Sequence, residues 1–319
     1  MSRKIVIGID TSNYTTSVAL MTTDGELIAN IKRPLPVKAG ECGLRQSDAV
    51  FAHIKNLPSA MNEAREYLNG DVPIAVGVST RPRNVEGSYM PCFLSGVAAA
   101  ESISAATGAP LYSFSHQCGH IMAAVYSSGR NEHLKKEFCA FHVSGGTTEV
   151  LRVSPVSDGF SAELVGGSAD LNAGQVIDRI GVSLGLSFPA GRELEALALK
   201  NTEKIPRKKP KITNMKVNLS GLENIATALY KETNNKALTA AFVFDYIGRA
   251  LVMLAEGYEE RYGKTGFVFA GGVMCNGIIK SMLRERFDAS FAEPLMSADN
   301  AVGIAALTQR RYNSEKKYD

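Results

Sequence analysis

Two histidines four residues apart, His116 and His120, lie in a stretch whose composition predicts a helix. Positions i and i+4 of a helix share one face, so the two imidazoles can bind one metal ion together. The alternative is two histidines that share a helix face without a ligand. Gln117 stands where a His-Glu-x-x-His metalloprotease has its general base, so peptide hydrolysis by that route is not expected.

One late carboxylate, Asp299, precedes an apolar helical pattern near the end of the chain. A carboxylate at a helix start is favoured as an N-terminal cap, because it accepts bonds from free backbone N–H groups. A third metal ligand beside His116 and His120 is the other interpretation. The sequence alone leaves both open.

Small-residue turns follow apolar strands at three places: Asp10–Thr16, Ser144–Thr148 and Gly271–Asn276. Glycine lets the backbone approach a ligand closely, and a helix N-terminus favours anions. The first turn can also offer hydroxyl and N–H donors to a phosphate, although an ordinary Ser/Thr-rich turn has the same composition. Three such turns together predict a nucleotide held between two α/β lobes.

Two acids and one basic stretch are further candidates. Asp178 and Glu195 can accept ribose hydroxyls, or they can be solvent-facing acids near helix ends. The stretch Asn201–Lys216 carries six lysines and arginines and can contact RNA phosphates, although most charge runs are simply solvated.

Apolar runs and periodicity indicate the elements that must position these residues. A strand, a small-residue turn and a strand occur twice, which predicts an internal duplication and an antiparallel meander at the start of the chain. The expected strands are 4–9, 17–21, 27–31, 71–80, 111–114, 138–143, 149–153 and 266–270, and the expected helices include 47–68, 93–107, 240–261 and those that begin near His116 and Ala173.

The composition is that of an ordinary globular protein of 319 residues, 45% hydrophobic and 21% charged, with room for two domains. The net charge of +3 permits a nucleic-acid partner without requiring one. Five scattered cysteines favour a reducing compartment. The N-terminus lacks a signal-peptide pattern and no uninterrupted apolar run of about 18 residues occurs, so we expect a cytoplasmic protein with no membrane span.

Taken in order along the chain, the motifs resemble the TsaD family, the threonylcarbamoyl transferases of tRNA, from about Ile5 to Leu307. Each motif alone is weak, but the combination is specific. The motifs that carry the resemblance are His116–Ala124, Val143–Gly146, Gly174–Gly191, Leu219–Leu222, Ala270–Val273 with Asn276, and Asp299–Ala301.

This resemblance implies an α/β fold with two lobes, the actin-like (ASKHA) ATPase fold, with lobes at 1–135 and 136–299 and a helix from 300–319 packing back on the first. It implies one divalent transition metal, iron or zinc, held by His116, His120 and Asp299, and assigns Asp10 and Ser12 as catalytic. It further implies an adenine nucleotide, ATP or threonylcarbamoyl-AMP, with or without magnesium. The implied nucleotide-binding residues are Val143, Ser144, Gly145, Gly146, Thr147, Asp178, Gly191, Glu195, Gly271, Gly272 and Asn276.

The implied reaction moves a threonylcarbamoyl group from its adenylate to N6 of a tRNA adenosine next to the anticodon. The implied partners are tRNA, proteins similar to TsaB and TsaE, and a second subunit in a homodimer or heterodimer.

The chain departs from the family pattern at four places, which identifies it as a divergent paralogue. Asn13–Thr16 replaces Cys-Asp-Glu-Thr, Arg81–Gly87 replaces a Gly-Pro-Gly loop, Thr147 replaces a histidine, and Glu223 replaces a lysine. Two alternatives therefore remain: a carbamoyl-type transferase or ATPase with another acceptor, and a non-catalytic nucleotide-binding partner. The chain alone is expected to turn over weakly.

Overall fold

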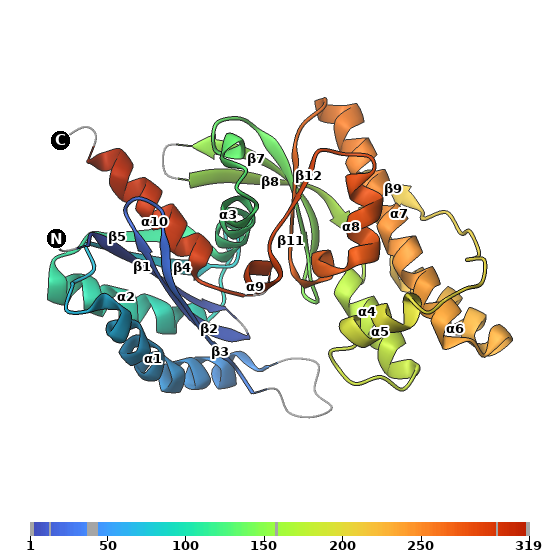
Figure 1. The fold of residues 1–319 in the computed structure, drawn as a ribbon, viewed down its shortest axis with the longest axis horizontal. Helices are drawn as coiled ribbons and strands as arrows, with labels where there is room; N and C mark the ends of the chain where they lie inside the picture. The colour runs from blue at the N-terminus through green and yellow to red at the C-terminus, as the bar shows by residue number, and fades with distance from the viewer. Residues whose placement is uncertain (1–2, 13, 37–43, 157–158, 298, 317–319) are drawn as a thin grey trace. The chain divides into compact units, whose positions relative to one another are not determined.

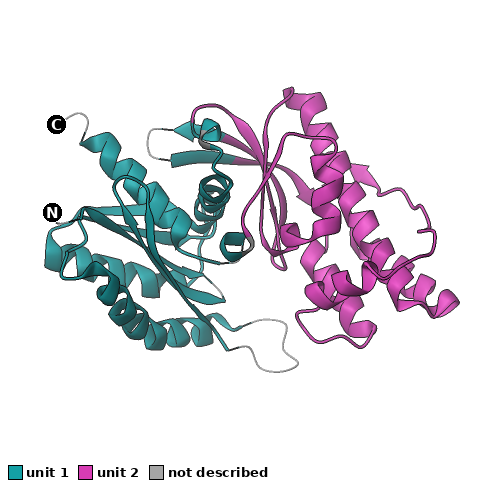
Figure 2. Ribbon diagram, viewed as in Figure 1, with its two compact units in different colours: residues 1–134, 154–162, 295–319 teal, residues 135–153, 163–294 magenta. Residues whose placement is uncertain are grey.

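The computed structural model describes residues 3–12, 14–36, 44–156, 159–297 and 299–316, so Asn13 and Cys42 lie outside the described residues. The chain divides into two compact units, which are described separately (Figure 2). Unit 1 comprises 1–134, 154–162 and 295–319, and unit 2 comprises 135–153 and 163–294. These units differ from the lobes expected from the sequence in three places: 154–162 and 295–299 group with unit 1, and Lys135 groups with unit 2.

Unit 1 is built on a five-stranded sheet in the order β3-β2-β1-β4-β5 (Figure 1). β1 to β3 form the predicted antiparallel meander, while β4 and β5 continue the sheet in parallel with β1. The strands are β1 (Ile5–Ser12), β2 (Thr15–Thr22), β3 (Leu27–Pro34), β4 (Ala75–Arg81) and β5 (Leu111–Ser115).

The first polar turn is shorter than the sequence predicts, because β1 and β2 continue into it. Asp10 pairs with Ser17 and Thr11 with Thr16 in the antiparallel ladder. These polar residues are buried, so the ladder satisfies their backbone groups where a solvated turn would have used water.

Helices cover both faces of this sheet. α10 packs so closely on β1 that a Cβ on Gly8 would overlap the backbone of Ala305, whereas α2 lies on the opposite face, with Gly96 against Thr11. The helices of unit 1 are α1 (Gln46–Leu68), α2 (Phe93–Thr107), α3 (His116–Ser128), η1 (Asn131–Leu134), α9 (Pro294–Ser297) and α10 (Val302–Glu315).

The buried face of α1 differs from its hydrophobic pattern. The pattern places Ile54 inside, but Ile54 is 57% exposed. His53 is fully buried instead and its Nδ1 lies 2.8 Å from the Thr16 hydroxyl of β2. A hydrophobicity pattern cannot detect a buried histidine that is stabilised by a partner on a distant strand.

Unit 2 repeats the sheet of unit 1. Its order contains β8-β7-β6-β11-β12, which matches β3-β2-β1-β4-β5, and β10 and β9 extend it beyond β8. β6 is antiparallel to β7 and parallel to β11, as β1 is to β2 and β4. The predicted internal duplication is therefore confirmed. The strands are β6 (Phe138–Val143), β7 (Thr148–Val156), β8 (Gly159–Ser168), β9 (Ile212–Thr213), β10 (Lys216–Val217), β11 (Phe267–Ala270) and β12 (Ala289–Phe291).

The core of unit 2 surrounds α7, which buries large side chains such as Phe242 and Tyr258. By length and composition α7 could cross a membrane, but 78% of its most apolar stretch is buried inside the protein, as in a core helix. The helices of unit 2 are α4 (Ala173–Ser183), α5 (Gly191–Ala198), α6 (Ser220–Thr233), α7 (Lys236–Tyr262), η2 (Gly272–Cys275) and α8 (Gly277–Arg284).

Candidate metal centre and nucleotide turns

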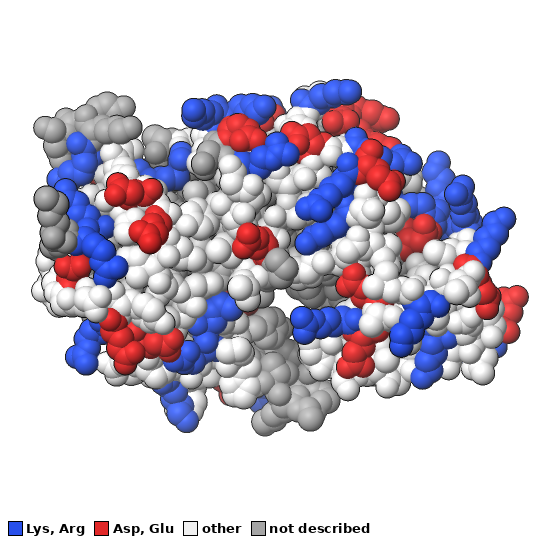
Figure 3. All heavy atoms as spheres, viewed as in Figure 1, with Lys and Arg blue, Asp and Glu red and all other residues white. Residues whose placement is uncertain are grey.

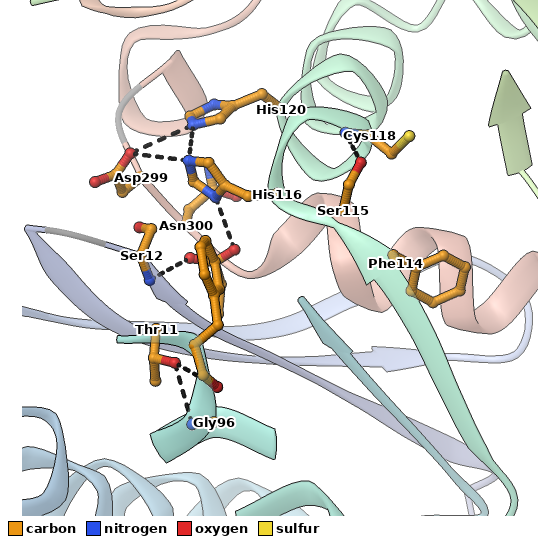
Figure 4. Close-up of polar contacts among 12 residues, drawn as sticks. Thr11, Ser12, Gly96, Phe114, Ser115, His116, Cys118, His120, Asp299 and Asn300 are labelled. Atoms are coloured by element: carbon orange, nitrogen blue, oxygen red, sulfur yellow. Dashed lines mark hydrogen bonds and ion pairs between the residues drawn. The ribbon is translucent and has the colours of Figure 1, made fainter. Parts of the chain in front are cut away.

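The two histidines of α3 meet at the beginning of the helix. Ser115 caps α3 by accepting a hydrogen bond from the N–H of Cys118, so the helix starts at His116. The imidazoles of His116 and His120 therefore project from one face, with 3.0 Å between their Nε2 atoms (Figure 4).

Asp299 joins this pair. Its Oδ1 lies 3.3 Å from Nε2 of His120 and 3.7 Å from Nε2 of His116. The three ligand atoms all lie within 4.8 Å of one another, close enough for one ion to bind them together. The helix-cap interpretation does not hold, because α10 begins at Val302, whose N–H donates to Asn300 Oδ1 instead.

Asp10 orients the first histidine from the opposite side of the ring. Its Oδ2 lies 2.8 Å from His116 Nδ1, and its Oδ1 accepts a bond from the N–H of Ser12. A carboxylate on the far nitrogen fixes the tautomer and direction of a metal-binding imidazole. Asp10 is therefore placed to position His116, and buried Ser12 lies next to it on β1.

The electrostatics of this cluster favour charged carboxylates. Burial opposes ionisation of Asp10 and Asp299, but His116 outweighs it at Asp10 and His120 and His116 outweigh it at Asp299, so both pKa values lie below the usual range. Burial alone would lower the pKa of His116, yet Asp10 and Asp299 raise it to about 9. In the metal-free protein a proton on His116 thus offsets one of the two carboxylate charges.

The donor set fits a transition metal. Two imidazole nitrogens and one carboxylate oxygen are the ligands of catalytic zinc and of non-haem iron sites, which keep positions open for substrate. The orienting carboxylate of Asp10 adds the supporting contact that such sites commonly have.

In unit 2, the predicted turn between β6 and β7 is held by its own serine. Ser144 Oγ accepts from the N–H groups of Gly146 and Thr147 and lies 2.9 Å from Thr147 Oγ1. The N-terminus of α4 packs on this turn so closely that a Cβ on Gly174 would lie 2.6 Å from the Gly145 nitrogen. A helix N-terminus and a small-residue turn are thus brought together, as an anion site requires.

The glycine turn after β11 packs against the same region. Gly271 has a φ of 98°, and a Cβ there would overlap the carbonyl oxygen of Val143. A Cβ on Gly272 would have no heavy atom within 4 Å, so there is open space beside this residue. Val143 itself is fully buried and packs under this glycine turn.

The predicted ribose acceptors are tied to nearby backbone. Asp178 Oδ1 accepts from the N–H of Ala190, beside Gly191 at the start of α5, and Glu195 Oε1 accepts from the N–H of Gly277. Burial raises the pKa of Asp178, against the effect of the Ala190 bond. Both acids are partly exposed, and each is held by one main-chain hydrogen bond.

Asn276 caps α8 through its Oδ1, which accepts from the N–H of Ile279. Its side chain is 6% exposed, and its Nδ2 has no hydrogen-bond partner among the described residues. Leaving a buried donor unpaired is costly, so this atom suits a ligand acceptor beside Glu195 and Gly277.

Six basic side chains of the 201–216 stretch are exposed, and the short β9–β10 hairpin closes its end. Basic and acidic groups are interspersed over the face that Figure 3 shows. The exposed basic residues are Lys204, Arg207, Lys208, Lys209, Lys211 and Lys216.

Two residues near the metal centre were not anticipated. His53 binds Thr16 from α1, and Lys32 of β3 donates to the carbonyl oxygen of Leu295, in the segment that leads to Asp299. A polar residue within an amphipathic helix and a lysine within a partly buried strand were the signals, and both patterns are also common at plain surfaces.

A model of the family "TsaD: tRNA N6-adenosine threonylcarbamoyltransferase" matches residues 43–306. Proteins with that name from Streptococcus suis and Streptococcus pneumoniae are each 29% identical over 99% of this chain and 94% of their own length.

Two solved structures show the fold. HypF of T. kodakarensis has a TM-score of 0.65 at 13% identity, covering 98% of this chain and 48% of that one. Component A of (R)-2-hydroxyglutaryl-CoA dehydratase from Acidaminococcus fermentans has a TM-score of 0.57 at 15% identity, covering 99% and 100%. The predicted actin-like ASKHA class is confirmed.

Proposed function

Because this chain belongs to the TsaD family of tRNA threonylcarbamoyltransferases, which are acyltransferases, we propose that it transfers a threonylcarbamoyl group from threonylcarbamoyl-AMP to N6 of a tRNA adenosine next to the anticodon. The observation that carries this proposal is the convergence of His116, His120 and Asp299 on one point within a chain that the family model matches over residues 43–306.

His116, His120 and Asp299 hold one divalent transition metal, iron or zinc, in this proposal. An ion held by these residues would supply Lewis-acid chemistry towards the carbamoyl carbonyl group. Asp10 holds His116 by its Nδ1 and so aims its Nε2 at the metal position, and Ser12 lies beside Asp10 on the same strand.

Unit 2 binds the adenine nucleotide, ATP or threonylcarbamoyl-AMP, with magnesium where phosphates are present. The support is the contact between the Ser144–Thr147 turn and the N-terminus of α4, together with the unpaired Nδ2 of Asn276. Two fold relatives were solved with nucleotide: HypF in a phosphate- and nucleotide-bound form and a Clostridium difficile dehydratase activator with ADPNP. Asp178 and Glu195 each accept a main-chain bond through one carboxylate oxygen, and the second oxygen of each is the proposed acceptor for the ribose.

The acceptor is tRNA, and the exposed basic side chains of 201–216 give its phosphates a place to bind. We further propose a cytoplasmic protein that works with partners similar to TsaB and TsaE, as a homodimer or heterodimer. Because affinity for RNA phosphates falls with salt, raising the salt concentration should weaken tRNA binding strongly.

A transferase or ATPase with another acceptor is the second candidate. Tyr14 and Thr15 stand where family members carry two acids, and Thr147 stands in place of a histidine. Acids near a phosphate commonly hold a cation or a water, and neither Tyr14 nor Thr15 does this as well.

Genetic complementation separates the two. The gene is expressed in a bacterium depleted of its own transferase, and threonylcarbamoyladenosine in tRNA is measured by mass spectrometry, with His116→Ala as the inactive control. Restored modification by the wild-type gene alone supports tRNA as the acceptor. A well-expressed chain that restores none, even with partner proteins from its own host, rejects it.

A further inference from the structure

Lys32 lies on the same face of the unit 1 sheet as the metal centre. It is paired with Ser17 on β2, and Ser17 is paired with Asp10 on β1. Directly opposed residues of antiparallel strands share a face, and Asp10 faces His116. Successive residues of a strand point to opposite faces of the sheet, and the next residue, Arg33, indeed forms an ion pair with Glu63 of α1 on the opposite face.

The positive charge of the Lys32 ammonium group has a neutral hydrogen-bond partner, the Leu295 carbonyl group. Its Nζ donates to the Leu295 carbonyl oxygen at 3.1 Å, a neutral partner, and no other acceptor among the described residues bonds to its remaining two hydrogens. Lys32 is only partly exposed, and burial lowers its pKa while the nearby Asp299 carboxylate opposes that change. A partly buried cation whose hydrogen-bond partner is neutral favours an anion.

The charges around the centre lead to the same conclusion. A divalent metal ion bound through the imidazole nitrogens would be balanced by the carboxylates of Asp10 and Asp299. Lys32 then leaves one positive charge in excess beside the metal position. Threonylcarbamoyl-AMP carries two kinds of oxyanion, the threonine carboxylate and the phosphate.

We propose that Lys32 binds an oxyanion of the substrate, carboxylate or phosphate, next to the metal centre. The identity of the substrate rests on the proposed function, but the anion site does not. The competing role is structural: the hydrogen bond from Lys32 would only hold β3 to the Leu295 carbonyl group. The two roles have different requirements. The structural role needs one hydrogen-bond donor at this position, whereas an anion site needs a positive charge.

The test measures anion binding to the metal-loaded full-length protein by calorimetry. The probes are inorganic phosphate, N-carbamoyl-L-threonine, and its uncharged amide as the neutral counterpart. Lys32→Gln keeps a donor for Leu295 but loses the charge, and Lys32→Arg keeps the charge. Arg33→Gln is the matched control, since it removes a neighbouring charge on the opposite face of β3.

Lys32→Gln should weaken binding of at least one anion by about ten-fold or more, as expected for a charged hydrogen bond. The anion that responds identifies the carboxylate or the phosphate as the source. Lys32→Arg should stay within about three-fold, Arg33→Gln and the amide should not respond, and metal content should stay constant.

The proposal is overturned if neither anion binds the wild-type protein, if Lys32→Gln leaves both affinities unchanged, or if Lys32→Gln loses metal and stability together. Transfer assays separate this result from the proposed function. A wild-type protein that transfers nothing to tRNA, yet loses anion binding in Lys32→Gln, refutes the function and keeps the anion site. A wild-type protein that transfers normally, with Lys32→Gln unaffected in affinity and in KM, refutes only the site.

Discussion

The metal centre of unit 1 and the nucleotide turns of unit 2 are built in different ways. At the metal centre, side chains contact one another: His116 meets His120, Asp299 and Asp10 within 2.8 to 3.7 Å. In unit 2, the candidate side chains mostly bond to nearby main chain, as Asp178 does to Ala190.

This difference determines which substitutions should abolish binding in each region and which should destabilise the fold. A site made of converging side chains loses its ligand when one of them is removed, with little change in the fold. A site made of main-chain groups tolerates many side-chain changes but not an added Cβ where two backbone segments touch. Metal content and stability should therefore separate in unit 1 and change together in unit 2.

The largest effect is expected for His116→Ala. Removing one of three protein ligands should lower metal content from about one ion per chain to near zero, measured by mass spectrometry on protein purified without chelator. Above about pH 9, where protonated His116 no longer contributes, the melting temperature of the metal-free protein should change little, since a core of this size does not depend on one ion. Equal metal content in the wild type and in His116→Ala would remove these residues from the metal site.

The metal-free protein should lose stability as the pH rises. The pKa of His116 is raised from 6.5 to about 9 in the folded state, so its contribution is fully present below about pH 6.5 and is lost through pH 9. The melting temperature relative to His116→Gln should fall by several degrees across this window. A constant difference between the two proteins would show that His116 carries no such charge, and bound metal should abolish the slope.

Gly271→Ala tests the main-chain character of unit 2. Its φ of 98° and its overlap with the Val143 carbonyl group predict a loss of about 1–3 kcal/mol in the free energy of unfolding. Gly272→Ala is the matched control, because its Cβ meets nothing within 4 Å. Equal stability of the two variants in urea titrations would mean that this turn adapts freely.

Two substitutions can separate the proposed ribose binding of Asp178 from its hydrogen bond to Ala190. Asp178→Ala should weaken ATP binding by about ten-fold or more, since a carboxylate on ribose hydroxyls contributes about 1.5–3 kcal/mol. Asp178→Asn retains an oxygen for the Ala190 N–H, so it should recover stability without recovering affinity. Unchanged ATP affinity in both variants, measured by calorimetry, would exclude Asp178 from the nucleotide site.

The smallest and most specific effect concerns the first turn. Tyr14→Asp with Thr15→Glu restores the two acids of the family pattern, and it should raise the weak turnover expected of the chain alone with threonylcarbamoyl-AMP and unmodified tRNA. Tyr14→Asn with Thr15→Gln controls for size without charge. Robust turnover by the unmodified chain would show that these acids are not needed.

Local patterns predicted a large part of the molecule. The bounds of α2 and β6 are those expected from the sequence, and α1 begins one residue earlier than expected. The repeated strand–turn–strand pattern predicted the duplicated sheet, although β8 and β12 were not anticipated. These features depend on the periodicity of neighbouring residues, which a single sequence displays directly.

The spacing of His116 and His120 by itself determined that two imidazoles share a helix face, because α-helical geometry is local. Only the tertiary structure decided that Asp10, 106 residues away, holds His116, and that Asp299 completes the cluster and is no helix cap. It also decided that Lys32 lies on the same face of the sheet as the metal centre, because Lys32 is paired with Ser17 and Ser17 is paired with Asp10. Strand register and helix packing select which distant polar groups meet, and no local pattern contains that information.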